Sequence, residues 1–357
     1  MENDKVQFLP PRVIAWEVTR RCPLKCRHCR AGAADVPYAR ELSTDECRRV
    51  LDTLGPRPPT GQPNNPNNPN NRTMPPPMVI WTGGEPMLRP DILELVSHAT
   101  SLGVRSVMAP CGMLVTEDRL RALKDAGVMA CSFSLDGPDA ASHDAFRGVP
   151  GAYDNVTRAM RVARDIGMPF QVNTTVSTLN LDRLDEIHAK AVELGAAKLD
   201  LFFLVPVGRG KGISQYALSP EQTTRVLDWA FDKAVRGPLA IKETCCPSAP
   251  AYWTSWCNSR TSQPANPPTR EPANPPTCQP HPHGGAPVPG AHPGVQPPCG
   301  CLGGRGFAFL SHVGDLQTCG FIDRPCGNIR DFACDFRALI ASAANPLGAR
   351  GTCRGVV

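Results

Sequence analysis

The chain alternates short apolar runs with helical segments, and this alternation constrains the fold more than any other feature. Apolar runs rich in β-branched residues lie at 13–18, 78–82, 104–109, 129–135, 170–176 and 199–205. Helical patterns separate them: a Ser43/Glu46 capping box opens the first, and glycine follows the helices predicted at 152–166 and 181–194. Six strand–helix units in series predict an α/β fold with a parallel sheet and right-handed crossovers. A further helix, at 220–235, closes this part.

Two low-complexity segments interrupt the alternation. Residues 56–77 form an insertion rich in Asn and Pro, and residues 258–298 are richer still in Pro and repeat the sequence Pro-Ala-Asn-Pro-Pro-Thr. Such composition cannot bury a core, so both are predicted to be solvated loops. We therefore divide the chain into a barrel-like domain at 10–236, a connector at 237–257, the Pro-rich loop at 258–298 and a small C-terminal domain at 299–357.

Composition narrows the functional classes. The net charge of +5 suits an anionic substrate, but no basic run with interleaved aromatic residues argues for nucleic acid. No apolar run reaches the length of a membrane span, and the first ten residues lack the apolar stretch of a secretory signal. We therefore expect a cytoplasmic protein whose sixteen cysteines are not paired as disulfides.

Three cysteines stand close together near the N-terminus, at Cys22, Cys26 and Cys29, in a Cys-x3-Cys-x2-Cys spacing. Three thiolates on one loop can hold three irons of a [4Fe–4S] cluster and leave the fourth iron open to a small chelating molecule. Zinc sites usually combine two close pairs of ligands, and only Cys26 and Cys29 make such a pair here. The spacing favours a catalytic cluster, with a non-catalytic iron–sulfur carrier or a zinc-binding module as the alternative.

Further polar motifs follow other predicted strands at their C-terminal ends, where a barrel of this type builds its active site. The glycine pair after the second strand lets the backbone approach a ligand closely, and the glutamate beside it can accept a bond from an ammonium group. The serine and aspartate after the fourth strand can bond ribose hydroxyls or a carboxylate, although Asp-Gly is also an ordinary turn signal. These candidate binding residues are Gly83, Gly84, Glu85, Ser134, Asp136 and, in the fifth strand, Asn173.

Together, the cysteine triplet and the Gly-Gly-Glu-Pro run at 83–86 resemble the radical S-adenosylmethionine (SAM) enzymes. The resemblance implies a partial (β/α)6 barrel in which the open iron binds the amino and carboxylate groups of SAM, with residues 83–86 around the amino group. It also implies that an electron from the cluster cleaves SAM to a 5′-deoxyadenosyl radical, which abstracts an unactivated hydrogen. A flavodoxin- or ferredoxin-type protein is the expected electron donor.

Several longer stretches resemble the alternative haem biosynthesis branch of this family, and most of all its haem b synthases. They lie at 15–20, 29–31, 136–151, 173–176, 204–206 and 244–245. The resemblance implies an oxidoreductase that decarboxylates two propionates of iron-coproporphyrin III to vinyls, each step releasing a β-hydrogen, carbon dioxide and one electron. Didecarboxysirohaem deacetylases, haem d1 maturation enzymes and peptide-modifying enzymes with a SPASM domain are the alternatives.

An iron-porphyrin substrate with four carboxylates calls for cations at the mouth of the barrel. Arg147, Arg209 and Lys211 are the candidates, and each also fits an ordinary surface charge.

The resemblance further implies a C-terminal domain of the SPASM type, whose auxiliary cluster would accept the electron. Cys301, Gly314 and Cys319 match its opening pattern, Cys-x9–15-Gly-x4-Cys. The family's second group, Cys-x2-Cys-x5-Cys-x3-Cys, is not found before Cys353 near the end of the sequence. We therefore expect a truncated domain whose second [4Fe–4S] cluster is missing or under-ligated.

The remaining cysteines have no partner at ligand spacing. We predict that Cys47, Cys131 and Cys334 are small core residues and that Cys278 is a loop thiol. The spacing leaves the others unassigned: Cys111, Cys245, Cys246, Cys257, Cys299 and Cys326.

Overall fold

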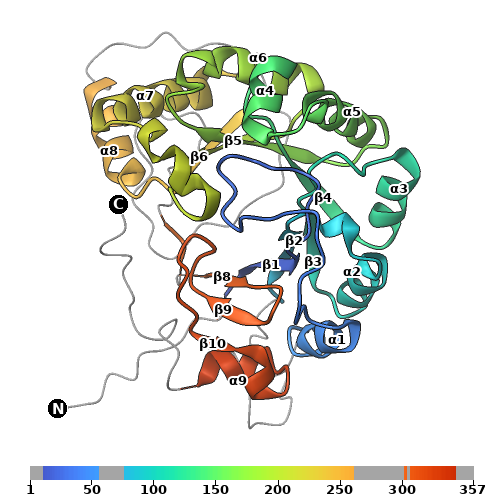
Figure 1. The fold of residues 1–357 in the computed structure, drawn as a ribbon. Coiled ribbons are helices and arrows are strands. Elements are labelled where there is room, and N and C mark those ends of the chain that lie inside the picture. Colours follow the sequence, from blue (N-terminus) through green and yellow to red (C-terminus); the bar gives the residue numbers. More distant parts are fainter. Residues whose placement is uncertain (1–10, 56–75, 261–300, 304–305, 343–357) are drawn as a thin grey trace, which may run out of the picture.

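The computed structural model of the chain describes residues 11–55, 76–260, 301–303 and 306–342 (Figure 1). Most of both low-complexity segments lies outside these residues. The described strands are β1 Val13–Thr19, β2 Met78–Gly83, β3 Arg105–Met108, β4 Val128–Ser134, β5 Phe170–Val176, β6 Lys198–Phe203, β7 Ala240–Thr244, β8 Phe307–Leu310, β9 Asp315–Gln317 and β10 Gly327–Asn328. The α-helices are α1 Thr44–Asp52, α2 Ile92–Ser101, α3 Glu117–Asp125, α4 Ala140–Arg147, α5 Ala152–Asp165, α6 Leu184–Leu194, α7 Pro220–Arg236, α8 Ala249–Arg260 and α9 Phe336–Ala341. Short 3-10 helices are η1 Pro86–Leu88, η2 Leu181–Arg183, η3 Gly208–Tyr216 and η4 Ile329–Phe332.

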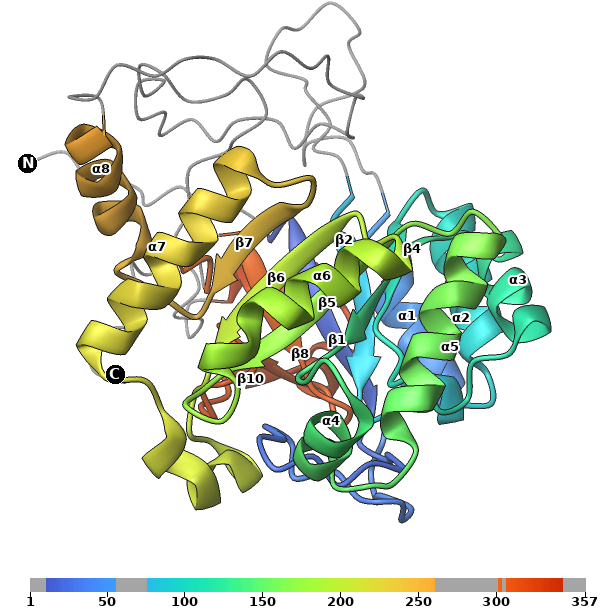
Figure 2. The same ribbon diagram turned by 90° about the horizontal axis from the view of Figure 1, so that it is seen from above.

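All of these strands belong to one sheet, in the order β10-β9-β8-β1-β2-β3-β4-β5-β6-β7. Each neighbouring pair from β1 to β7 is parallel, which confirms the predicted series of strand–helix units. The strands curve, and the helices that connect them lie in an arc on the outer side, so the sheet forms a partial barrel (Figures 1 and 2). The segment between β1 and α1 crosses its open side.

The sheet extends beyond the six predicted strands at both edges. β7 lies in the segment that the sequence assigned to a connector, where Lys242 and Glu243 interrupt the apolar pattern. At the other edge β8 pairs parallel with β1, and β9 and β10 follow antiparallel. Residues 307–328, which the sequence assigned to a separate C-terminal domain, therefore continue the barrel sheet. The neighbouring α9 lies close to α1, where the backbone N–H of Phe336 donates to Thr53 Oγ1 over 3.1 Å.

Local signals set the helix boundaries near the predicted positions. The Ser43/Glu46 capping box is present at the start of α1, and Gly195 ends α6 in the left-handed conformation, with φ of 86°. The predicted helix at 181–194 begins with the single 3-10 turn η2 before α6. Three helices were missed: α4, whose eight residues are mostly small and polar, α8, which follows β7, and the short α9.

The core fills the space between the sheet and its helices. Trp16 on β1 and Trp81 on β2 are paired in register and fully buried, and their rings stack with centroids 5.6 Å apart. The three cysteines predicted to be core residues, Cys47, Cys131 and Cys334, are all buried, which confirms that prediction.

Candidate functional site

The segment between β1 and α1 carries Cys22, Cys26 and Cys29, and we call residues 20–35 of it the cysteine loop. The loop contains turns and bends but neither helix nor strand. Cys22 and Cys26 are buried and Cys29 is half-buried in a small apolar cluster that also contains Leu24 and Ala33. The structure therefore brings the three predicted ligands together at the end of β1, on the open side of the sheet.

Three free thiols on one loop are the ligand type and number that a [4Fe–4S] cluster with one open iron takes. Within the described ranges no group of three His, Cys, Asp or Glu side chains is arranged to hold a single metal ion. Buried nitrogens of three side chains around the loop also lack a hydrogen-bond partner: His28 Nδ1, Arg147 Nε and Arg209 Nη2. An anionic group held by the loop would give the two guanidinium donors a partner.

The Gly83–Gly84 pair at the end of β2 holds the cysteine loop against the sheet. A Cβ on Gly83 would lie 2.1 Å from the carbonyl oxygen of Thr19, and one on Gly84 would lie 2.2 Å from that of Arg21. The backbone N–H of Gly84 donates to Thr19 O over 2.8 Å. The close approach that requires glycine here is thus between two protein segments, and contact of the pair with SAM stays a prediction.

Glu85, predicted as an ammonium acceptor, accepts protein N–H groups in the structure, and its contact with SAM stays a prediction. Its side chain is fully buried, and its carboxylate oxygens accept the backbone N–H groups of Met87 at 2.8 Å and Cys111 at 2.6 Å. Burial raises the pKa of this carboxyl group, and the bonds from Cys111 and Met87 oppose the rise. Glu85 therefore fastens the loop after β3 to the turn after β2.

Asp136 and Arg147 form a buried ion pair beneath the cysteine loop. Asp136 also accepts the backbone N–H of Thr175 at 2.7 Å, and Nη1 of Arg147 donates to Cys26 Sγ over 3.6 Å. Burial alone would raise the pKa of Asp136, but the Arg147 guanidinium lowers it below its usual range. The prediction of Arg147 as a surface cation was wrong, because α4 ends under the loop and turns this side chain inward. The carboxylate of Asp136 thus has protein partners in the structure, and its contact with SAM stays a prediction.

Ser134 and Asn173 sit opposite each other in the register of β4 and β5, and both side chains are half-buried. The amide oxygen of Asn173 accepts a hydrogen bond from Gln171 Nε2 at 2.8 Å. Ser134 is the last residue of β4 and Asn173 lies in the middle of β5, and both keep part of their surface accessible.

Arg209 in η3 supports the cysteine loop from the side of β6. Its Nε donates to Cys26 O over 2.9 Å and its Nη1 to Ala33 O over 2.6 Å. It therefore does not present a free guanidinium at the mouth, as the sequence had suggested, whereas Lys211 in the same segment is exposed.

His28 lies between two cluster cysteines and stacks on Phe146 of α4, with ring centroids 4.6 Å apart. Burial, followed by the charge of Arg147, lowers the pKa of His28 to about 4. The ring is therefore neutral near pH 7, which suits packing of the loop against α4.

A further cysteine, Cys111, lies beside the cysteine triplet. Cys111, in the loop after β3, is half-buried and packs against the apolar cluster that contains Cys22 and Cys26. Interaction between the thiols of Cys22 and Cys111 lowers the pKa of Cys22 and raises that of Cys111. Burial raises the pKa of Cys26. Sequence spacing could not assign Cys111, because 81 positions separate it from the triplet's last member at residue 29 and turn residues surround it.

Arg30 connects the cysteine loop to the C-terminal strands. Its Nη2 pairs with Glu17 Oε2 at 2.6 Å, its guanidinium lies 4.2 Å from the ring centroid of Phe309, and its Nη1 donates to Gly320 O over 3.4 Å. Burial would raise the pKa of Glu17, but the bond with His312 and the two nearby arginines lower it to about 2. The residue after Cys29 thus touches the residue after Cys319.

A second group of thiols gathers beyond this link. Cys301 is exposed and Cys319 is half-buried, and the point where a Cβ of Gly303 would sit lies 3.5 Å from both Cys301 Sγ and Cys319 Cβ. Cys245, at the end of β7 with φ of 62°, lies within electrostatic range of both thiols. Cys353 lies outside the described residues.

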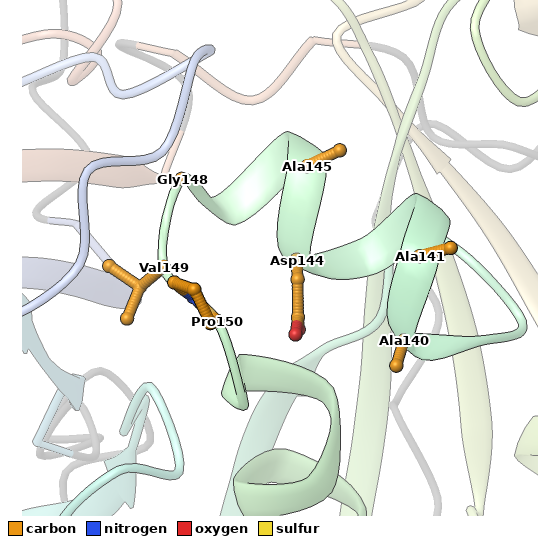
Figure 3. Close-up of a pocket in the computed structure, with 7 residues that line it drawn as sticks. All are labelled: Ala140, Ala141, Asp144, Ala145, Gly148, Val149 and Pro150. Carbon is orange, nitrogen blue, oxygen red and sulfur yellow. The ribbon is translucent and has the colours of Figure 1, made fainter.

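A hollow of about 450 Å³ opens on α4 and the turn that follows it (Figure 3). Its lining is small and apolar except for Asp144, whose oxygens already accept the backbone N–H groups of Gly151 and Tyr153. With its polar group committed, the hollow has little with which to recognise a charged substrate.

In the part of the chain that the structure describes, no helix is long and apolar enough to cross a membrane.

The profile of the radical SAM superfamily matches residues 74–191 of the chain. An AdoMet-dependent heme synthase from Nitratidesulfovibrio vulgaris is 40% identical over 321 residues, which cover 90% of this chain and 76% of that protein. One from Methanosarcina barkeri is 34% identical, over 90% of this chain and 80% of that protein. A Fe-coproporphyrin III synthase from the same organism is 29% identical over 62% of this chain and 51% of its own.

Solved structures share the fold at low sequence identity. Native anSMEcpe with bound AdoMet superposes with a TM-score of 0.63 at 16% identity, covering 94% of this chain and 82% of that one. Streptococcus suis SuiB bound to the precursor peptide SuiA gives a TM-score of 0.64 at 14% identity, covering 96% and 67%. Both superpositions take in the C-terminal strands as well as the barrel.

Proposed function

This chain belongs to the radical SAM superfamily, and from that premise we propose that it decarboxylates two propionates of iron-coproporphyrin III to vinyls and so forms haem b. As a member of the superfamily it is an enzyme that uses a [4Fe–4S] cluster and SAM. Its place in haem biosynthesis is supported by relatives named AdoMet-dependent heme synthase and Fe-coproporphyrin III synthase. That the reaction is the decarboxylation of iron-coproporphyrin III, rather than another step of haem biosynthesis, is our proposal.

The observation that carries the proposal is the extent of the similarity to the heme synthases. Three of them match 90% of the chain at 34–40% identity, whereas the match to a pre-heme d1 synthase is 29% identical over 69%. Because 321 of the 357 residues are matched, the similarity extends on both sides of the Pro-rich segment.

Within this proposal, Cys22, Cys26 and Cys29 bind the cluster, and Ser134 and Asn173, paired on neighbouring strands, are our candidates to contact SAM. When bound, the cluster and SAM supply a radical that removes a hydrogen atom from an unactivated carbon. Gly83, Gly84, Glu85 and Asp136 contribute by fixing the loop that holds the ligands, and the apolar cluster around the thiols excludes water.

The oxidative reaction also needs a destination for one electron in each decarboxylation. Cys301 and Cys319, with Cys353 as the third cysteine named by sequence, are our candidates for an auxiliary cluster, and Cys245 lies within electrostatic range of the first two. The iron content of the reconstituted chain tests this site, because one cluster gives about four irons and two clusters give about eight. A flavodoxin- or ferredoxin-type protein is the proposed donor to the first cluster.

The test is a single-turnover assay under anaerobic conditions. The reconstituted chain, SAM, dithionite and iron-coproporphyrin III should give 5′-deoxyadenosine and a product whose mass is lower by two formate equivalents. The Cys26→Ala variant should lose the cluster's brown absorbance and the cleavage of SAM, and Cys47→Ala, a buried thiol in α1, is the matched control. Turnover of didecarboxysirohaem in place of iron-coproporphyrin III would assign the deacetylase reaction instead.

A further inference from the structure

The C-terminal end of α4 is bonded to the cysteine loop on both sides of Cys26. The backbone N–H of Lys25 donates to Arg147 O over 3.1 Å, and that of Arg27 donates to Phe146 O over 2.9 Å. Because these donors lie just before and just after Cys26 in the chain, the end of α4 is fixed relative to this predicted cluster ligand.

The guanidinium of Arg147 extends from this point to the sulfur of Cys26. Its Nη1 donates to Cys26 Sγ over 3.6 Å, which is hydrogen-bond contact for the large sulfur atom. Its Nη2 pairs with Asp136, whose carboxylate also accepts the backbone N–H of Thr175. Nε is buried and has no hydrogen-bond partner among the described groups. A buried positive charge is therefore held against a ligand sulfur, and one of its donors is left for the cluster itself.

We propose that Arg147 is a positioning residue that donates a charged hydrogen bond to the Cys26 thiolate and thereby raises the reduction potential of the cluster. Hydrogen bonds to cluster sulfurs are one of the levers by which a protein sets such potentials. Reduction adds negative charge to the cluster and its sulfurs, so a cationic donor stabilises the reduced form more than the oxidised form. Burial strengthens the effect, because charges interact more strongly where water is excluded. The inference rests on the cluster and not on the identity of the tetrapyrrole.

A purely structural role, as the counter-ion of Asp136, makes a different prediction. Asp136→Asn breaks the ion pair but keeps the guanidinium beside Cys26, whereas Arg147→Met breaks the same pair and removes the donor. A structural role predicts that both variants affect the cluster in the same way. The proposed role predicts opposite shifts of the potential, because one variant removes a negative charge near the cluster and the other removes a positive charge.

The double variant Asp136→Asn/Arg147→Met isolates the hydrogen bond. It removes one charge of each sign, so the net charge near the cluster is unchanged and the donor to Cys26 is lost. It also leaves no unpaired charge in the interior, which favours folding. Glu117→Gln/Arg121→Met, which removes the exposed ion pair of α3 in the same way, is the matched control.

The experiment is an EPR-monitored redox titration of the anaerobically reconstituted full chain. The cluster is identified by the change in its signal when SAM is added, which separates it from any second cluster. The titration contains no tetrapyrrole, so it tests the inference even if the proposed reaction is wrong.

In Asp136→Asn/Arg147→Met the oxidised-to-reduced ratio at a fixed potential should rise about threefold to tenfold, a shift of about 30 to 60 mV toward negative values for a one-electron couple. Asp136→Asn alone should shift the potential toward positive values, and the control should coincide with wild type. A potential of the double variant equal to that of the control overturns the proposal. So does a shift of the same sign in Asp136→Asn and Arg147→Met.

A second measurement needs no change at Arg147. In a chain that contains ¹⁵N-labelled arginine, pulsed EPR of the reduced cluster should detect a coupled ¹⁵N nucleus. Arg209→Met should keep this coupling, because Arg209 donates to the carbonyl oxygen of Cys26 and not to its sulfur. Absence of the coupling, or its loss in Arg209→Met, overturns the proposal even if the Arg147 variants do not fold.

Discussion

Removing the carboxylate of Asp136 should destabilise the chain strongly, because it leaves a buried guanidinium without its counter-ion. Asp136 is 2% exposed and Arg147 is 8% exposed, so neither charge is screened by solvent. Breaking a buried pair by deleting one partner costs about 3 to 5 kcal/mol. The exposed pair Glu117–Arg121 is a matched control, since deleting one partner of a surface pair costs at most about 1 kcal/mol.

The assay is urea-induced unfolding of the cluster-free chain, followed by far-UV circular dichroism. We expect Asp136→Ala to lower the free energy of unfolding by about 3 to 5 kcal/mol and Glu117→Ala by less than about 1 kcal/mol. The double variant Asp136→Ala/Arg147→Met should recover part of the loss, because it leaves no unpaired charge in the interior. If Asp136→Ala proves no more costly than Glu117→Ala, the pair is not buried as described and the reasoning is refuted.

Two further predictions test how the cysteine loop is held. Gly84→Ala should reduce iron uptake sharply, because its Cβ would lie 2.2 Å from a backbone oxygen of the loop, whereas Gly212→Ala, with nothing within 4 Å, should not; equal iron uptake by both variants would contradict this. The pKa of Glu17 is lowered from 4.5 to about 2, so its contribution to stability is present above pH 4.5 and is lost as the pH falls toward 2. Glu17→Gln should therefore lose less stability than wild type between about pH 5 and about pH 3, measured by urea midpoints, and an unchanged pH dependence would argue against a native carboxylate.

The alternation of apolar runs and helical patterns was sufficient to predict the parallel sheet. Parallel strands buried on both faces are continuous apolar runs, and few other structures give that pattern. The prediction failed for β7, where Lys242 and Glu243 break the run, and for the placement of β8, because strand order is set by contacts between distant segments. β8 pairs with β1 only after the chain has passed through the whole barrel and the Pro-rich segment.

In the candidate site, too, features that are local in sequence were predictable and contacts between distant segments were not. The spacing of the cysteine triplet and the motifs at strand ends identified the correct region, because they are local in sequence. The roles of individual charges were not predictable, since Arg147 beside a glycine has the pattern of an exposed helix end. Its burial depends on where α4 packs, and Asp136, 11 positions earlier, becomes its partner only after folding. The neighbour pair Cys22–Cys111 likewise has no signal in spacing.

The cysteine loop owes its geometry to its surroundings, because it has no helix or strand of its own. Ordering each of its residues costs about 1 to 2 kcal/mol of conformational entropy, and contacts from outside the loop must offset that cost. They come from the end of β2, from Arg209 in η3, from Arg147 in α4 and, through Arg30, from β1 and Gly320. Because the last of these contacts belongs to the C-terminal segment, that segment stabilises the cysteine loop whether or not it holds a second cluster. Loss of activity after a change near Cys319 therefore cannot be assigned to electron transfer until the iron content of the first cluster has been measured.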